Sequence, residues 1–411
     1  MIKFDKFVLK NGLRVIVHKD NTTPTVAFNL LYNVGARDEN PKKTGFAHLF
    51  EHLMFGGSVN IPDFDKPIQM VGGENNAFTN NDITNYYITL PKENIETAFW
   101  IESDRMLSLA FSEKSLEVQR NVVVEEFKQR YLNQPYGDVW LLLHPLAYKM
   151  HPYNWATIGK DISHIQNAKM KDVKDFFYGH YAPNNAILTV AGNVKTSEVK
   201  MLAEKWFGMI EPRKITKRNL PKEPVQEKPQ TKKVIRDVPY DAIYKLYHTC
   251  GRMHKDYHTT DLISDLLANG KSSRLYNSLV KDKAMFAELD GFVMGTIDPG
   301  LFVITGKLMK GVSMKDADNA ILNELAKLEK DITERELEKV KNKYEANIVL
   351  SEMSVLNKAM NLGYYELLGD AGMINSEIDK YRSVTIKDVI RLTKKIFVKN
   401  NCSTLFYHSN K

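Results

Sequence analysis

The chain has 411 residues, and its formal net charge is +7 because 57 lysine and arginine residues outnumber 50 aspartate and glutamate residues. A chain of this length is too long for one hydrophobic core and usually divides into two or three domains. Hydrophobic residues make up 43% and charged residues 26%, as is typical of a globular protein, and two cysteines exclude a disulfide framework.

The N-terminal residues bear on the location of the protein. Residues 1–17 lack the long apolar core of a signal peptide, and no apolar run approaches the length of a membrane span. We therefore expect a cytoplasmic protein without a membrane partner, and a processed exported form is the alternative.

The first half of the chain mixes predicted strands and helices. Residues 7–17 predict a β-hairpin, in which Asn11-Gly12 would supply the positive φ angles of a type I′ turn. The other predicted elements of this half are strands over 26–32 and 186–190 and helices over 44–57, 93–107 and 114–131.

The second half predicts a similar mixture. Thr333 and Glu336 have the spacing of a capping box at the start of a helix over 333–352, and residues 285–306 contain short β-rich runs. The two halves also share a pattern. Lys171-Asp172-Val173 precedes Asn184-Asn185 and a strand, and the same residue types precede a strand at 387 and 400, where 387 − 171 = 216 and 400 − 184 = 216.

This repeat predicts an α+β fold built from two structurally similar domains, each an antiparallel-rich sheet with helices, related by duplication. The expected domains are residues 1–212 and 234–411. Residues 213–233 between them hold much of the excess positive charge, three prolines and few aromatic residues, which favours a solvated basic linker over a nucleic-acid site. We therefore expect no nucleic-acid partner.

The segment over 44–57 contains His48-Leu49-Phe50-Glu51-His52. Residues four apart lie on one face of a helix, so His48 and His52 can direct two imidazoles at one metal ion. Glu51 lies beside that face, within reach of a metal-bound water, and His-x-x-Glu-His is the inverzincin order of a zinc hydrolase. A satisfied structural histidine is the ordinary alternative for either residue taken alone.

A catalytic zinc site needs a third protein ligand. Residues 119–127 predict a helix with a valine-rich apolar side, and they include Glu125 and Glu126, either of which could face inward. The pattern alone does not choose between them. Three other histidines lie near no second ligand pattern and are predicted to be structural: His144, His151 and His164.

The second half cannot hold the same site. At the offset of 216, His48 and His52 correspond to Ser264 and Ala268. If Gly56 is matched with Gly270 instead, they correspond to Leu262 and Leu266.

Several motifs together resemble the pitrilysin-type zinc peptidases, which include mitochondrial processing peptidases and insulin-degrading enzymes. The matching stretches span nearly the whole chain: residues 11–15, 34–39, 44–55, 76–79, 102–106 and 272–276. The resemblance implies zinc ligation by His48, His52 and a distal glutamate placed at Glu126, with Glu51 as the general base. It also implies that Asn76, Ala77, Phe78 and Thr79 form a substrate-binding edge strand.

Two positions depart from the family pattern. Gln119 stands where the family often has a glutamate that supports the site, which would alter metal affinity or water basicity. Val280 and Ala287 stand where family members place an arginine and a tyrosine that reach the substrate.

The resemblance also bears on assembly. It implies a clamshell of four such domains, of which this chain would supply half, so we expect a dimer. A heterodimer with a metal-free homologous chain would supply the missing arginine and tyrosine, and a homodimer is the alternative. The predicted function is a zinc-dependent endopeptidase acting on peptides or unfolded segments in an enclosed chamber. The alternative is a non-catalytic binding or assembly subunit.

Overall fold

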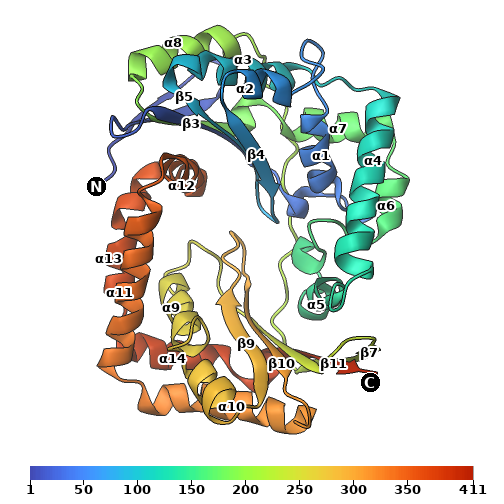
Figure 1. The fold of residues 1–411 in the computed structure, drawn as a ribbon, viewed down its shortest axis with the longest axis vertical. Coiled ribbons are helices and arrows are strands. Elements are labelled where there is room, and N and C mark those ends of the chain that lie inside the picture. Colours follow the sequence, from blue (N-terminus) through green and yellow to red (C-terminus); the bar gives the residue numbers. More distant parts are fainter. Residues whose placement is uncertain (411) are drawn as a thin grey trace. The chain divides into compact units, whose positions relative to one another are not determined.

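The computed structural model describes residues 1–410, which fold into two compact units (Figure 1). Unit 1 comprises Met1–Arg130, Trp155–Pro221 and Val349–Ser376. Unit 2 comprises Tyr131–Asn154, Lys222–Ile348 and the residues from Glu377 onward. These bounds differ from the continuous ranges 1–212 and 234–411, because each unit includes a segment from the other half of the chain.

Unit 1 contains a six-stranded sheet in the order β1-β2-β6-β3-β5-β4. Neighbouring strands are antiparallel except β2 and β6, which are parallel. The strands are β1 (Asp5–Val8), β2 (Arg14–Lys19), β3 (Thr25–Tyr32), β4 (Glu74–Thr79), β5 (Thr84–Pro91) and β6 (Ala186–Gly192). β4 lies at one edge of the sheet.

Helices cover both faces of this sheet, so its central strands are buried along most of their length rather than at alternate residues. All seven residues of β6 are buried. The helices of unit 1 are α1 (Phe46–Phe55), α2 (Asp65–Met70), α3 (Ile95–Leu107), α4 (Glu113–Phe127), α6 (Ile162–Gln166), α7 (Met170–His180), α8 (Thr196–Phe207) and α12 (Val355–Leu368). The aromatic rings of α3 and α8 pack on Phe28 of β3, with Phe99 at 5.0 Å and Phe207 at 6.5 Å between ring centroids.

The helix α12 comes from the second half of the chain but packs on β3 and β6 of unit 1. Its Leu362 joins a buried cluster with Ile16 and Ile187 of the sheet. The approach is close at Gly363, where a Cβ atom would lie 3.1 Å from Thr189 Oγ1. In Figure 1 the red-brown α12 accordingly lies beside the blue strands of this unit.

Unit 2 repeats the same topology with one strand fewer. Its sheet has the order β7-β11-β8-β10-β9, with β7 and β11 parallel and the remaining pairs antiparallel. The strands are β7 (Gln230–Arg236), β8 (Ala242–His248), β9 (Phe286–Val293), β10 (Leu301–Leu308) and β11 (Cys402–Ser409). The helices are α5 (Val139–Ala147), α9 (Tyr257–Leu267), α10 (Met314–Asp331), α11 (Glu334–Ser351), α13 (Glu377–Arg382) and α14 (Ile386–Ile396).

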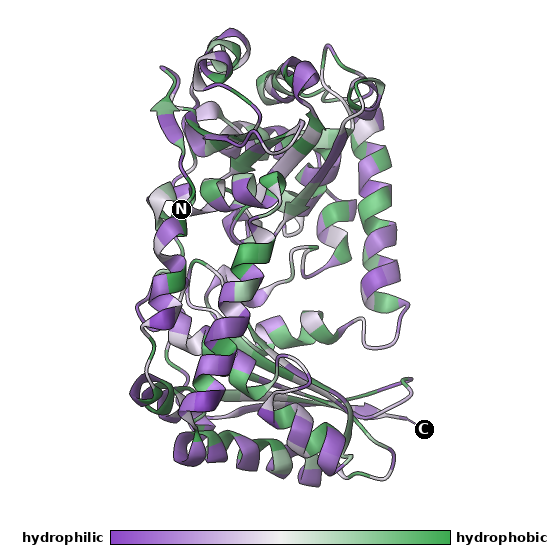
Figure 2. Ribbon diagram, turned by 60° about the vertical axis from the view of Figure 1, so that its left-hand side comes forward, coloured by the Kyte–Doolittle hydropathy of each residue, from purple (hydrophilic) through white to green (hydrophobic). Residues whose placement is uncertain are grey.

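The predicted duplication is present at the predicted offset. The starts of α7 and α14 differ by 386 − 170 = 216, and those of β6 and β11 by 402 − 186 = 216. The starts of α5 and α12 differ by 355 − 139 = 216, and α5 packs on the sheet of unit 2 as α12 packs on that of unit 1. Each half of the chain therefore lends one helix to the sheet of the other half. Figure 2 shows mixed hydrophobic and hydrophilic turns along the helices, as expected of helices that bury one face.

One local expectation is wrong. The hairpin of β1 and β2 forms, but only Gly12 of the Asn11-Gly12 pair has a positive φ, of 89°, so the turn is not type I′. Asn11 instead donates its side-chain amide to the carbonyls of Phe207, at 2.7 Å, and Ile210, at 2.9 Å. The loop is therefore shaped by contacts with the end of α8.

Residues 213–229, within the expected basic linker over 213–233, form no helix or strand and are mostly exposed, but two of their arginines have partners. Arg213 donates to the carbonyls of Tyr181 and Met106, and Arg218 pairs with Asp38 at 2.7 Å, so both arginines are bound to unit 1. The last four residues of the range belong to β7, which begins at Gln230. Among residues 1–410, no helix is long and apolar enough to cross a membrane.

Candidate metal centre

The helix α1 starts where the chain turns sharply at Gly45. This residue has a φ of 88°, and a Cβ atom on it would lie 2.5 Å from the carbonyl oxygen of Ile158, so only glycine fits here. The turn sends the apolar side of α1 into unit 1, where Leu49, Phe50 and Leu53 are buried. The polar side of the helix is left to face α4 and β4.

His48 and His52 lie on this polar side, one turn apart. Their ring centroids are 4.8 Å apart, and the rings are nearly perpendicular. Glu126, near the end of α4, places Oε2 3.3 Å from His52 Nε2 and 3.7 Å from His48 Nε2. Among the described residues, this trio is the one group of histidine, cysteine or acidic side chains placed to hold a metal ion, with all its ligand atoms within 4.8 Å of one another.

The structure distinguishes the two adjacent glutamates that the sequence pattern left open. Glu125 points away from the histidines and pairs with Lys128 at 2.6 Å, and its side chain is 59% exposed. Glu126 is only 17% exposed. The difference arises because α4 turns the second glutamate, and not the first, toward α1.

The protonation states suit a metal site. Burial lowers the pKa of His48 to about 4, although the nearby Glu126 opposes this shift. The adjacent His52 imidazole, together with the charge of Arg130, holds the pKa of Glu126 below its usual range, although partial burial opposes this. At neutral pH His48 is therefore a neutral imidazole and Glu126 an ionised carboxylate, which are the forms that ligate metals.

Arg130 is a site residue that the sequence reasoning missed. Its guanidinium lies 3.1 Å from Glu126 Oε1, so it holds the carboxylate oxygen that does not face the histidines. The signal for it was the i, i+4 spacing of a glutamate and an arginine on one helical turn. The chain here passes from α4 into a π-helical turn, Lys128–Leu132, a distortion that is frequent at functional sites.

Glu51 lies on the same helix between the two histidines. Burial raises the pKa of its carboxyl, while nearby polar groups of Thr79 and the imidazole of His52 act in the opposite direction. Its position places a half-buried carboxylate beside both the trio and the strand β4.

The strand β4 is an open edge. Asn80 N–H donates to Ile83 C=O at 3.0 Å and closes the hairpin between β4 and β5. Because bonded and non-bonded pairs alternate along an antiparallel ladder, Ala77 and Thr79 direct their backbone groups toward the free edge. The Ala77 N–H donates instead to Asn76 Oδ1, at 2.8 Å. The structure thus brings the four residues 76–79 to an edge next to α1, with Phe78 38% exposed.

The remaining predicted residues lie outside the trio. Gln119 is beside the end of α1, where a Cβ atom on Gly56 would lie 3.9 Å from its Nε2. In unit 2, Val280 packs on the apolar core and Ala287 is exposed on β9.

The three histidines predicted to be structural have protein partners. His144 Nδ1 lies 2.7 Å from Tyr153 C=O, and His151 lies 3.5 Å from Asp298. His164 Nδ1 lies 2.8 Å from Thr44 Oγ1, just before α1.

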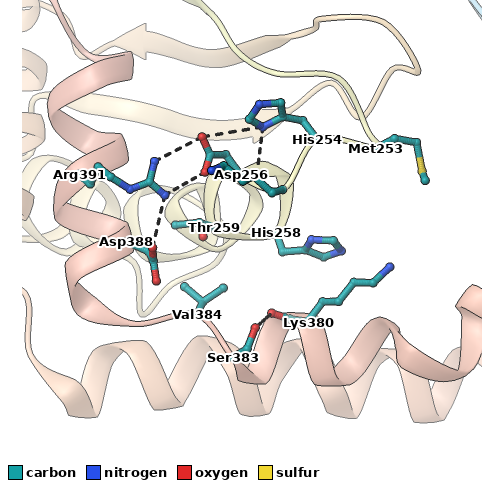
Figure 3. A pocket seen from close by; sticks show the side chains of 11 residues that line it. Met253, His254, Asp256, His258, Thr259, Lys380, Ser383, Val384, Asp388 and Arg391 are labelled. Carbon is teal, nitrogen blue, oxygen red and sulfur yellow. Dashed lines mark hydrogen bonds and ion pairs between the residues drawn. The ribbon is translucent and has the colours of Figure 1, made fainter.

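Unit 2 has a cavity of about 640 Å³ between α9, α13 and α14 (Figure 3). Two carboxylates line it, Asp256 and Asp388, and both pair with Arg391, at 2.9 Å and 3.3 Å. His258 bonds to Glu377 at 3.2 Å. Among the described residues that line the cavity, both carboxylates are thus paired with Arg391, and they belong to no group placed to hold a metal ion.

Comparison with known proteins identifies relatives along the whole chain. The family model described as insulinase (peptidase family M16) matches residues 14–161, and that described as peptidase M16 inactive domain matches residues 167–344. The zinc protease PqqE of Helicobacter pylori is 31% identical over 98% of this chain and 92% of that protein.

Solved structures agree with this. The crystal structure of a protease from Helicobacter pylori has a TM-score of 0.93 and 30% identity and covers 99% of this chain and 100% of that one. The periplasmic protease PqqL from Escherichia coli matches 98% of this chain with a TM-score of 0.80 and 17% identity, and this chain spans 47% of it. The chain therefore belongs to peptidase family M16, the insulinase family.

Proposed function

We propose that this chain is a zinc-dependent endopeptidase whose metal ligands are His48, His52 and Glu126. The observation that carries this proposal is the convergence of two imidazole nitrogens on one carboxylate oxygen at 3.3 Å and 3.7 Å. Ligand atoms about 2.0–2.2 Å from a tetrahedral zinc ion lie roughly 3.3–3.6 Å from one another, close to these two distances, and imidazole and carboxylate are donors that zinc accepts. Three protein ligands would leave a fourth position open, as catalytic zinc sites do.

Zinc bound there would act as a Lewis acid that makes a water molecule acidic and polarises a peptide carbonyl. The Glu51 carboxylate would accept the proton of the attacking water and hand it to the leaving amine. Its partial burial suits this role, because a raised pKa brings a carboxylate nearer to the pH at which a general base works best. Arg130 would keep Glu126 ionised and fix which of its oxygens faces the histidines.

The substrate would bind as an added strand on β4. An extended peptide can pair with the free N–H and C=O groups of an edge strand, and such pairing tolerates many side chains. The Ala77 N–H would be a central donor to that peptide, once the Asn76 side chain leaves it. The Asn76 Nδ2 group would donate to the scissile carbonyl. This mode of binding favours peptides and unfolded segments as substrates.

We further propose that the active form is a dimer that encloses the site. This chain spans about half of PqqL, a protease whose single chain is about twice as long. Val280 and Ala287 provide no side-chain hydrogen-bond donor at the places where a resembling peptidase has arginine and tyrosine. A heterodimer with a metal-free homologous chain would supply both groups, whereas a homodimer would need other donors.

The test is hydrolysis of a quenched fluorescent peptide library by the purified, zinc-loaded chain, with Glu51→Gln as the matched control. Glutamine keeps the size of the side chain but cannot take a proton, so we expect hydrolysis to be lost while zinc stays bound at one equivalent. Full activity in Glu51→Gln would refute the role of Glu51.

Two other outcomes separate the remaining alternatives. Stoichiometric zinc with no hydrolysis by the chain alone would support the heterodimer, and the missing partner would be sought among co-purifying homologous chains. Purification without zinc, and failure to take it up, would instead favour a non-catalytic binding or assembly subunit.

A further inference from the structure

A buried carboxylate lies at the start of α1, outside the metal trio. Glu39 is only 5% exposed and follows the 3₁₀ turn Ala36–Asp38. Its Oε1 accepts the backbone N–H of Ala47 at 2.8 Å. Its Oε2 accepts the backbone N–H of Gly45 at 2.9 Å and the indole N–H of Trp155 at 3.0 Å. Three N–H groups thus converge on one carboxyl group.

The first turn of α1 needs such an acceptor. The first four N–H groups of a helix have no partner within the helix, and a side chain at the N-cap usually satisfies one of them. The N-cap of α1 is Gly45, which has no side chain to offer. Glu39 takes this role from six residues before the helix. Burial raises the pKa of its carboxyl, and the N–H groups of Ala47, Gly45 and Trp155 oppose that shift.

The orientation of the His48 imidazole depends on this first turn of α1 more than on hydrogen bonds of the ring itself. Ligating histidines usually bond their second ring nitrogen to an acceptor that fixes the ring. The Nδ1 atom of His48 is buried without a hydrogen-bond partner among the described residues. The position of its imidazole therefore rests on the backbone that carries it, and Ala47, directly before it, is held by Glu39.

We infer that Glu39 is a positioning residue, which clamps the first turn of α1 through Gly45 and Ala47 and thereby sets the aim of His48 at the metal. This inference rests on the proposed function for the identity of the metal and of its ligands. The hydrogen bonds of Glu39 go to Gly45, Ala47 and Trp155 and not to the three proposed metal ligands, so it would act through the backbone of α1.

The test compares Glu39→Gln with the matched control Glu366→Gln. Glu366 is also 5% exposed and lies in unit 1, where it accepts the Ala371 N–H at 3.3 Å and pairs with Lys6. Glutamine at position 39 keeps one acceptor oxygen but replaces the other with an amide N–H₂ group. That group would face a backbone or indole N–H, so two donors would face each other. We expect zinc affinity to fall about 10- to 100-fold in Glu39→Gln and to stay within about twofold of wild type in Glu366→Gln.

Two further readouts separate positioning from general destabilisation. In the metal-free protein, amide exchange should quicken at the start of α1 in Glu39→Gln but not across the sheet of unit 1. The visible absorption bands of the cobalt(II)-loaded protein should shift in Glu39→Gln and not in Glu366→Gln. A fall in thermal stability with unchanged cobalt bands and zinc affinity would show a merely structural role and overturn the inference.

A second variant keeps the test decisive if Glu39→Gln does not fold. Glu39→Asp preserves the charge but withdraws the carboxylate by one methylene group, so it also should weaken zinc binding, and wild-type affinity there would overturn the inference. None of these measurements uses a peptide substrate. Failure of the wild-type chain to bind zinc would overturn the proposed function, whereas wild-type zinc binding that both Glu39 variants retain would overturn the role of Glu39 alone.

Discussion

Replacing Glu126 by glutamine removes a proposed metal ligand while the shape of the side chain stays the same. The neighbouring replacement, Glu125→Gln, is a matched control, because the two residues are adjacent on α4 and only Glu126 faces the histidines. Glu125 forms an exposed ion pair with Lys128 at 2.6 Å. The pair of variants therefore changes the same functional group at positions one residue apart.

The expected magnitude follows from the number of ligands. Structural zinc sites with four protein ligands bind the ion with about 10–16 kcal/mol, or roughly 2.5–4 kcal/mol for each ligand. A tenfold change in affinity corresponds to about 1.4 kcal/mol, so losing the Glu126 carboxylate should weaken zinc binding about 10²- to 10³-fold. Glu125→Gln should change zinc affinity less than about threefold and unfolding by less than about 1 kcal/mol, since exposed ion pairs contribute little.

The assay is competition for zinc between each purified variant and a fluorescent chelator of known affinity, at one pH and one salt concentration. Far-UV circular dichroism of both metal-free variants checks that the fold is retained. Equal weakening by the two replacements would refute the assignment of Glu126, and so would wild-type affinity in Glu126→Gln.

Two further outcomes are expected. Asn76→Ala should lower kcat/KM about 10²-fold without changing zinc affinity, because the amide can no longer donate to the substrate carbonyl, and peptide kinetics with zinc titration check both halves of this statement. Lys358, on α12, bonds Asp20 at 2.6 Å and lowers the pKa of that carboxyl. Because the pKa of Asp20 is lower in the folded than in the unfolded chain, the ion pair stabilises the fold fully above the unfolded pKa of about 3.9, and this stabilisation is lost as the pH falls. Lys358→Met should therefore lower the free energy of unfolding by about 1.5 kcal/mol at pH 7 and by progressively less toward pH 3. Urea unfolding at both pH values measures this difference, and a constant difference would contradict the linkage.

Local patterns predicted the parts of the site that one helix carries. The spacing of His48 and His52 is enough to place two imidazoles on one face, because helix geometry alone decides it. The choice between Glu125 and Glu126 lay beyond that reasoning, since it depends on how α4 packs against α1. The family resemblance favoured Glu126, and in the structure that residue faces the histidines.

Long-range packing explains what the sequence reasoning missed. An amphipathic pattern shows that a helix has a buried face, but not which sheet that face meets, so the exchange of α5 and α12 between the halves had no local signal. The Asn11-Gly12 turn was mistaken for type I′ because Asn11 uses its side chain to bond carbonyls about 200 residues away. Arg213 and Arg218 likewise counted as linker charge until their partners in unit 1 were known.

The two units indicate why the same topology holds a candidate site only once. α1 and α9 occupy matching places, each between a central strand and the edge strand that follows it. The side chains of His48 and His52 in α1 are 14% and 24% exposed. The corresponding residues of unit 2 are Ser264 and Ala268 at the offset of 216, or Leu262 and Leu266 if the glycines are matched, and all four are buried. A helix that only has to cover a sheet gains most from burying its inner face. A metal helix must instead keep a polar face open toward its third ligand, and we infer that Glu39 holds the first turn of this helix through Gly45 and Ala47. The chemistry of α1 thus depends on residues outside the shared topology, so the duplicated fold can persist in unit 2 without them.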